Sequence, residues 1–225
     1  MKKITLLLSL LTFSIFGFAQ TNFYKLGIGA GAGGTLAFAD LEKKTIAFAA
    51  YTTIDYYITP YLSLGLEGQK GELAGGDILF DANNRQFINS YITGTINLKL
   101  SVGEFIPDYQ RKIPFYNFLS GVYGGVGLGV IKNKISNVRY YGENYYPGED
   151  TSTEEIIPLN LGFNVNFSDQ WGYNRYGINV NLQTTFDFGE GLDGYTPTKG
   201  KSDIYSFFSV GLKYRFGFMG IDKRR

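Results

Sequence analysis

The chain has 225 residues, 21 Lys and Arg against 20 Asp and Glu, and neither cysteine nor histidine. This composition excludes disulfides, histidine-ligated zinc and the Ser-His-Asp and Cys-His arrangements, so we expect no enzyme, cofactor or metal site. Balanced charge gives no basic stripe for nucleic acid, while abundant aromatic residues and 30 glycines favour strands with turns.

The first residues have the pattern of a secretory signal peptide. Lys2 and Lys3 precede an apolar run from Ile4 to Phe16, and Gly17-Phe18-Ala19 offers a small-x-small cleavage site. The apolar run is about 13 residues long, below the ~20 that a helix needs to cross a bilayer. We therefore expect residues 1–19 to be removed on export and the remaining chain to contain no transmembrane helix.

Eight later segments alternate apolar residues with polar residues or glycine, the period of a β-strand. They are 23–33, 45–58, 61–69, 87–101, 116–131, 156–167, 176–188 and 204–218. Alternation alone leaves two architectures open, because a soluble barrel of the lipocalin kind shows the same pattern turned inside out.

Strand length and connections favour a membrane barrel. Most segments reach the ~9–11 residues that a tilted transmembrane strand needs. The connections at 59–60 and 168–175 are short, and those at 34–44, 70–86, 132–155 and 189–203 are long and polar, as in outer-membrane barrels. The 102–115 connection is an exception, since it is long for a periplasmic turn. Aromatic residues near the short turns suggest an interfacial belt: Tyr56, Phe167, Tyr176, Tyr214, Phe216 and Phe218.

The last segment carries a terminal motif. Ser209, Gly211, Tyr214 and Phe216 fill the polar, glycine and two aromatic positions of the C-terminal insertion signal of bacterial outer-membrane barrels. With the export signal and eight alternating segments, the chain resembles the small outer-membrane barrels of the OmpA/OmpX type.

That resemblance implies an all-β fold, an eight-stranded antiparallel up-and-down transmembrane β-barrel over residues 20–218, with a basic tail at 219–225. It implies a place in the outer membrane of a Gram-negative cell, contact with outer-membrane lipid, both termini in the periplasm and assembly by the barrel-assembly machinery. We expect a monomer.

A glycine-rich run at 29–34 matches G-x-G-x-x-G, the dinucleotide-binding fingerprint. That motif requires a following helix whose N-terminus receives the phosphates. Here the glycines continue the period of a strand, so we interpret them as lumenal residues that make room for large neighbours.

Six charged residues fall on polar strand faces: Asp55, Glu67, Lys99, Asp187, Lys213 and Arg215. They could line a selective pore, form an acid–base pair, or satisfy one another as a buried network. The interior of an eight-stranded barrel is only about wide enough for side chains, which favours the network. Glu67 and Lys99 lie on neighbouring strands and are the best candidate pair.

The 138–150 segment is rich in tyrosine. It combines Arg139 with Tyr140, Tyr141, Tyr145 and Tyr146, a composition typical of recognition surfaces. An equally good interpretation is that these tyrosines extend the strands or join the outer girdle. Nearby acidic residues lack the spacing of a calcium loop.

Three functions stay open at this point. The leading one is a non-enzymatic barrel with a structural or surface-interaction role, whose long loops contact an extracellular or envelope protein or glycan. The alternatives are a narrow passive channel and an accessory barrel of a secretion or envelope-assembly machine.

Overall fold

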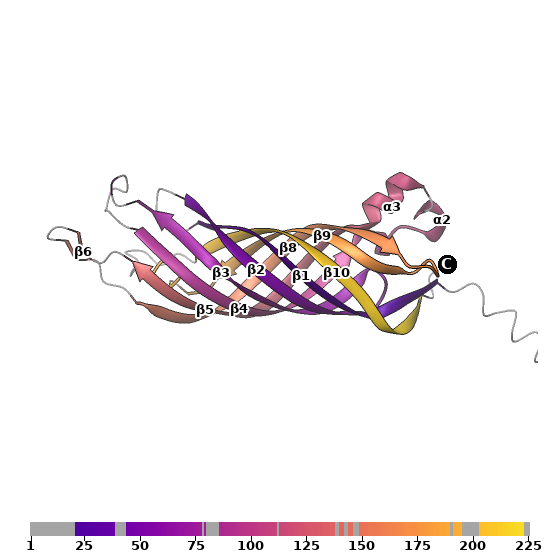
Figure 1. Ribbon diagram of the computed structural model, residues 1–225, viewed down its shortest axis with the longest axis horizontal. Coiled ribbons are helices and arrows are strands. Elements are labelled where there is room, and N and C mark those ends of the chain that lie inside the picture. Colours follow the sequence, from indigo (N-terminus) through magenta and orange to yellow (C-terminus); the bar gives the residue numbers. More distant parts are fainter. Residues whose placement is uncertain are drawn as a thin grey trace, which may run out of the picture.

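A closed ring of eight long antiparallel strands forms the body of the molecule (Figure 1). The computed structural model describes residues 21–38, 44–77, 79, 86–111, 113–137, 140–141, 144–145, 149–189, 191–194 and 203–222. The ring contains β1 (Thr21–Phe38), β2 (Lys44–Tyr57), β3 (Leu62–Gly76), β4 (Gln86–Ser101), β5 (Val122–Asn137), β8 (Thr151–Ser168), β9 (Asn174–Asp187) and β10 (Ile204–Asp222). Neighbours in the ring are neighbours in sequence, and β10 closes on β1. The eight-stranded up-and-down barrel is confirmed.

The strand register fixes the width of the barrel. Followed from Lys70 through β4 and β5, the paired positions reach β8 at Thr153. Followed the other way through β2, β1, β10 and β9, they reach β8 at Phe163, ten residues further along. Eight tilted strands with this stagger enclose a bore that side chains can fill.

The two ends of the barrel differ (Figure 1). One end holds the short β2–β3 and β8–β9 turns, the end of β10 and a helical connection; the other holds a hairpin of β6 (Tyr140–Tyr141) and β7 (Asn144–Tyr145). We call them the turn end and the loop end. Among the described residues, no helix is long and apolar enough to cross a membrane.

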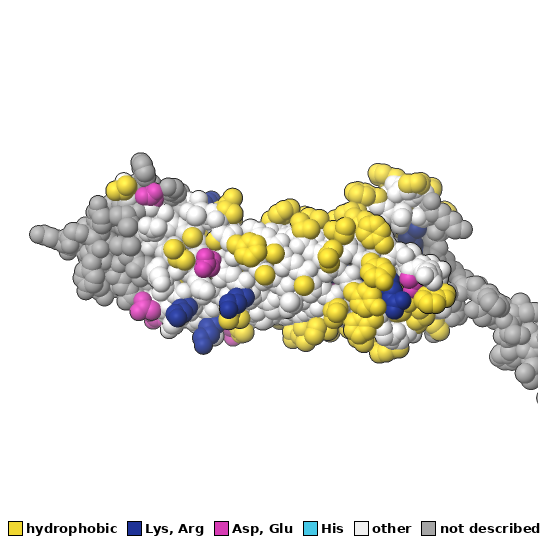
Figure 2. Space-filling view, viewed as in Figure 1, with side chains coloured by type: hydrophobic (Ala, Val, Ile, Leu, Met, Phe, Trp, Pro, Cys, Tyr) yellow, Lys and Arg dark blue, Asp and Glu magenta, His cyan; other side chains and the backbone are white. Residues whose placement is uncertain are grey.

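The outer wall is apolar where a membrane would surround it. Leu128, Leu161 and Leu212 point outward and are 66%, 61% and 69% exposed. Their inward neighbours on the same strands are polar or glycine, as the register of the strands requires. On the face shown in Figure 2, hydrophobic side chains cover the middle and the turn end. A soluble barrel would have the opposite arrangement, so the structure supports the transmembrane interpretation.

The strands are longer than the sequence pattern predicts. They span 14 to 19 residues, and β3, β5 and β8 include residues 70–76, 132–137 and 151–155 that we expected in loops. The reason is an inversion of polarity toward the loop end of these three strands. On β5, outward Val130 is followed by outward Lys132, while the inward position between them is the buried Ile131. The strand continues above the membrane with the pattern of a soluble protein.

The connection between β4 and β5 is helical. It contains η2 (Val102–Glu104), α2 (Asp108–Arg111) and α3 (Pro114–Ser120), so the strand expected from residue 116 begins at Val122 instead. Pro114 in the first turn of α3 suits a helix start. The ring of Phe118 lies 4.3 Å from that of Phe163 on the outward face of β8, which places α3 against the outside of the wall.

The last strand also exceeds its predicted limit. β10 continues to Asp222, so residues 219–222 of the expected basic tail belong to the barrel. Gly217 has a φ of +84° at the point where the β1–β10 register shifts by one residue, the geometry of a bulge that glycine tolerates best. The predicted signal peptide, residues 1–19, and the basic residues 223–225 lie outside the described part of the chain.

A polar cluster joins β1 to the β8–β9 turn at the turn end. The Tyr24 hydroxyl donates to Asp169 Oδ2 at 2.8 Å, and Arg175 lies 3.9 Å from the same oxygen. Desolvation acts to raise the pKa of Asp169, but the hydrogen bonds from Tyr24, Tyr173 and Trp171 and the charge of Arg175 outweigh it and hold that pKa below its usual value.

Replacement of Leu212 by Arg tests the assignment of the faces. A cation at the bilayer midplane of the lipid face costs about 2–4 kcal/mol, so L212R should reduce the amount of assembled, heat-modifiable barrel in the outer membrane. Leu79→Arg, an exposed leucine in the β3–β4 connection, is the matched control and should assemble normally. Normal levels of L212R would show that the faces are assigned backwards.

Candidate functional site

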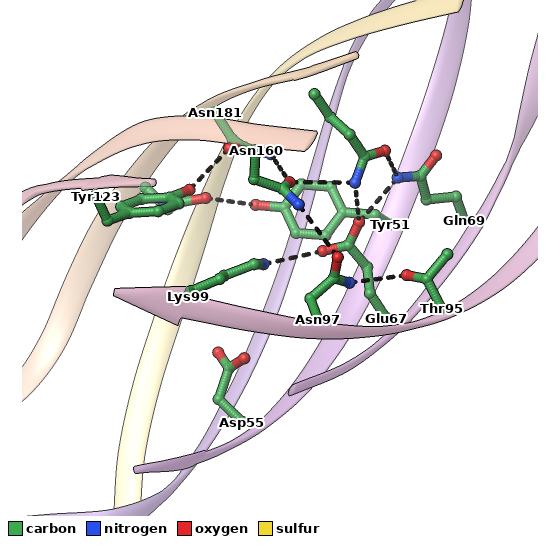
Figure 3. A network of polar contacts seen from close by, with 12 residues as sticks. Tyr51, Asp55, Glu67, Gln69, Thr95, Asn97, Lys99, Tyr123, Asn160 and Asn181 are labelled. Carbon is green, nitrogen blue, oxygen red and sulfur yellow. Dashed lines mark hydrogen bonds and ion pairs between the residues drawn. The ribbon is translucent and has the colours of Figure 1, made fainter. Parts of the chain in front are cut away.

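The lumen is organised around the buried carboxylate of Glu67 (Figure 3). Lys99 Nζ lies 3.1 Å from Glu67 Oε2, which is the pair that the sequence predicts from the β3–β4 hairpin. The side-chain amides of Gln69 and Gln183 donate to Glu67 Oε1 at 2.8 and 3.0 Å. Gln183 comes from β9, on the opposite side of the ring from β3, so the carboxylate links two walls of the barrel.

Side-chain amides carry the network around the bore (Figure 3). Asn160 donates to Asn97 Oδ1 at 3.1 Å and accepts from Asn181 at 2.9 Å. Asn181 in turn accepts from the Tyr123 hydroxyl at 2.9 Å. Asn179 donates to the same hydroxyl at 2.9 Å. Each amide both donates and accepts, which satisfies polar groups that are shut off from water.

A second ion pair lies on the β2 and β10 walls. Lys213 Nζ is 3.0 Å from Asp55 Oδ2, and both side chains are almost fully buried. Arg215, two positions along β10, places its guanidinium 4.4 Å from the centre of the Tyr57 ring. Both cations predicted to face the lumen from β10 therefore have lumenal partners.

Asp187 is separate from these pairs. It is the last residue of β9, and its Oδ1 accepts from the backbone amide of Gly189 at 3.1 Å. The sequence places it on the polar face but does not indicate its height in the bore. Its side chain lies at the loop end, beside the β9–β10 connection and close to Glu154 of β8.

Glycines on β1 and β10 make room for the large lumenal rings. Gly31 pairs with both Tyr51 and Gly211. A Cβ at Gly31 would lie 2.6 Å from Tyr51 Cε1, so only glycine admits this ring. The Tyr51 hydroxyl then reaches Asn179 Oδ1 at 3.3 Å, across the bore. The run that matches G-x-G-x-x-G thus lies entirely within β1, which continues to Phe38.

A layer of buried, mostly apolar side chains fills the bore on the loop side of the network, with Asn89 and Asn133 at the same height. Tyr91 and Tyr205 pack with ring centres 5.6 Å apart, and Leu192 from the β9–β10 connection enters the same cluster. The fully buried apolar members of this layer are Tyr91, Tyr205, Phe87, Phe207, Leu73, Ile131, Ile156 and Leu192.

Hydrogen bonds fix Leu192 inside the bore. Asn89 donates to its carbonyl at 2.9 Å, and the amide of Gly191 donates to Glu154 Oε1 at 2.8 Å. We expected 189–203 to form a polar external loop, and residues 191–194 differ from that expectation by folding inward. Sequence reasoning missed this layer, although the inward Leu73, Ile131 and Ile156 carry its signal once the strands are extended.

The predicted recognition residues lie on the β5–β8 connection. Tyr140 pairs with Tyr145 and Tyr141 with Asn144, so the backbone forms a small hairpin. Arg139 and Tyr146 lie outside the described residues. Two residues, Gly142-Glu143, separate Tyr141 from its partner Asn144, which is the length of a hairpin turn, a signal that sequence reasoning did not use.

The insertion-signal residues divide between the two faces of β10. Ser209 and Gly211 are buried and face the lumen. Tyr214 and Phe216 are on the outward face, with their rings stacked 5.9 Å apart, and Tyr176 lies 5.5 Å from Tyr214. These three rings cluster near the turn end of the wall, as expected for an interfacial belt.

The two lumenal ion pairs are enclosed by the protein. Both buried ion pairs are internally compensated, and the apolar layer separates them from the loop end. Within the described residues, no group of three acidic side chains is placed to hold a metal ion. What this geometry does is fill the bore and join its walls.

Comparison with known proteins gives one family. The chain matches the model described as outer membrane protein beta-barrel domain over residues 5–217. A comparison with curated protein sequences found no match.

Several solved structures are similar to the chain at low identity. Neisserial surface protein A is 11% identical, with 87% of this chain and 99% of that chain covered and a TM-score of 0.49. Ail, the attachment invasion locus protein of Yersinia pestis, solved in complex with a heparin analogue, is 14% identical, with 86% and 99% covered and a TM-score of 0.45. OprG from Pseudomonas aeruginosa is 11% identical, with 86% and 98% covered and a TM-score of 0.37.

The Glu67–Lys99 pair makes a test of the network. Glu67→Gln leaves the Lys99 ammonium buried without its counter-charge, which should lower the free energy of unfolding by about 3–5 kcal/mol. Adding Lys99→Met should recover much of that loss, because no unpaired charge remains. Urea unfolding in lipid vesicles measures both changes.

Glu72→Gln is the control for this pair, since Glu72 is on the same strand but exposed on the outer wall. It should unfold like the native protein. Equal stability of the Glu67 and Glu72 variants would contradict the assignment of Glu67 as the centre of the network.

Proposed function

The chain belongs to the outer membrane protein β-barrel family, and from that premise we propose that it is a non-enzymatic, non-conducting barrel that displays its loop end to partners outside the cell. The observation that carries the proposal is the filled bore. Polar side chains occupy its middle and apolar side chains close it toward the loops. A barrel filled in this way acts through its surface.

A passive channel would need a continuous polar path through the barrel. The buried side chains of the described lumen argue against such a path. Tyr91, Tyr205 and Phe207 are at most 1% exposed, and Leu192 packs among them. Below them, the Glu67–Lys99 pair bridges β3 and β4. An ion passing through would have to displace both layers, each of which is tied to several strands.

The barrel wall extends beyond the membrane at the loop end. Strands of 14 to 19 residues exceed the ~9–11 needed to cross the membrane, so the wall continues beyond the lipid. The β6–β7 hairpin is attached to two of the long strands, β5 and β8. The segment is rich in tyrosine, a residue type that often carries much of the energy of an interface. An extracellular or envelope protein or a glycan is the class of partner that such a surface suits.

A second candidate, an accessory barrel of an envelope-assembly machine, is favoured by the helical connection at the turn end. Phe105, Tyr109 and Phe115 are 74%, 70% and 66% exposed there. A periplasmic partner protein could cover them. Cross-linking from residue 109 in intact cells would identify such a partner, and cross-links to lipid alone would reject it.

Planar-bilayer recordings test the closed lumen. The purified protein should produce no stepwise ionic current, because the apolar layer offers no hydrated path. A non-specific porin reconstituted in the same way provides the positive control. Stable single-channel currents from the native protein would reject the non-conducting proposal in favour of the channel.

A fourfold Tyr→Ser change at Tyr140, Tyr141, Tyr145 and Tyr146 tests the loop surface. Arrayed glycans and extracellular-matrix proteins serve as probes, and the variant should lose at least about tenfold in affinity for any that the native protein binds. The barrel should still assemble, since its strand ladder closes without this hairpin.

Tyr109→Ser with Tyr116→Ser, at the opposite end of the barrel, is the matched control and should keep all binding. If the fourfold variant fails to assemble, the tyrosines belong to the wall. If it assembles and binds as before, the hairpin is not the recognition surface.

A further inference from the structure

The outer wall contains a hollow inside the apolar band. It has a volume of about 400 Å³ and lies across β2, β3, β4 and β5. Its floor is a pair of outward-facing glycines, Gly68 and Gly94, which are opposite each other on β3 and β4. The apolar side chains that line it are Ile54, Leu66, Ile96, Leu128 and Val130.

The two glycines leave this space empty toward the membrane. A Cβ at Gly94 would meet no atom within 4 Å, and a Cβ at Gly68 would meet only Thr52 and Thr93, at 3.9 Å. The lumenal Gly31 differs, because a ring already occupies the space beside it. The hollow is therefore open to lipid, and its width of two strands, roughly 10 Å, accommodates a hydrocarbon chain.

Three lysines stand at the loop end of the hollow. Lys70 follows Gly68 by two positions, so it projects from the same face of β3, and Lys132 is across β4 from it with Ile92 between them. Lys134 is the next outward residue of β5. All three side chains are exposed, and Figure 2 shows basic side chains grouped on the loop side over β4 and β5. Lys70 and Lys132 are two strands apart, a distance that two lysine side chains can close on one anion.

The part of the chain that the structure describes offers these lysines no ion-pair partner. Within the described residues, no carboxylate lies within ion-pair distance of any of the three. The outward carboxylates nearest in the register are Glu72, opposite Ser90, and Glu155, opposite Val130. They flank the group, which keeps a net charge of +1 from three lysines and two glutamates.

We propose that this part of the wall binds one phosphorylated glycolipid of the outer leaflet, with an acyl chain in the Gly68–Gly94 hollow and a phosphate held by Lys70, Lys132 and Lys134. The lysines are on the loop side of the apolar band, which faces the outer leaflet, where phosphorylated glycolipid is the characteristic lipid. An apolar groove with cations at its headgroup end matches both parts of such a molecule.

Native mass spectrometry of the detergent-solubilised protein tests the headgroup contact with lipid A as the probe. The variant K70Q/K132Q/K134Q should bind lipid A about a hundredfold more weakly than the native protein. Lys25→Gln with Lys44→Gln removes two lysines outside this group and should leave binding unchanged. Dephosphorylated lipid A should bind the native protein as weakly as lipid A binds the triple variant.

A second variant tests the acyl contact. Gly94→Phe fills the hollow and should weaken lipid A binding about tenfold, whereas Gly124→Phe should have no effect. Gly124 is also an outward glycine with no atom within 4 Å of an added Cβ, but it lies outside the hollow. Soluble glucosamine phosphate should bind far more weakly than lipid A.

Three outcomes would overturn the site. One is equal binding of lipid A by the native protein and the triple lysine variant. Another is an equal effect of Gly94→Phe and Gly124→Phe. The third is equal affinity for phosphatidylglycerol and lipid A, which would show a general anionic-lipid surface instead.

Discussion

All partners of the Glu67 carboxylate must lie inside the bore of the barrel. Eight strands enclose a bore that is only a few side chains wide. Water cannot solvate the carboxylate there, so the protein supplies Lys99 beside it and Gln183 from across the barrel. Those partners in turn need partners, and the requirement extends through the asparagines to Tyr123. Glycine at Gly31 follows from the same limit, because the neighbouring strand β1 must leave space for the ring of Tyr51.

Above the membrane the same strands are surrounded by water instead of lipid. Water surrounds the wall there, so lysines and glutamates face outward, and apolar side chains such as Leu73 and Ile131 turn inward. One continuous ring of strands thus joins a membrane protein to a small soluble core. Both halves share one backbone ladder, which leaves no unpaired strand edge at the level of the lipid.

The part of the fold within the membrane could be predicted from sequence, because alternation gives both the strand and its lipid face. Leu212 and its neighbours on β10 were placed correctly on that basis. The extensions were missed because the outward residue changes from apolar to charged at Lys70 and Lys132, which imitates the start of a loop. The Glu67–Lys99 pair follows from one hairpin, but the contact with Gln183 depends on the stagger of the whole ring, which no local pattern contains. The helix α3 takes up the first residues of the strand predicted over 116–131, because its aromatic residues fit either pattern.

The inward fold of Leu192 has a consequence for how this protein can change over evolutionary time. The buried layer that it joins lies between the loops and the membrane-spanning half, and hydrogen bonds to β4 and β8 anchor the segment that carries Leu192. Insertions, deletions and substitutions at the loop tips are therefore separated from the Glu67 network by this buried layer. We expect such changes to leave the lumenal hydrogen bonds intact.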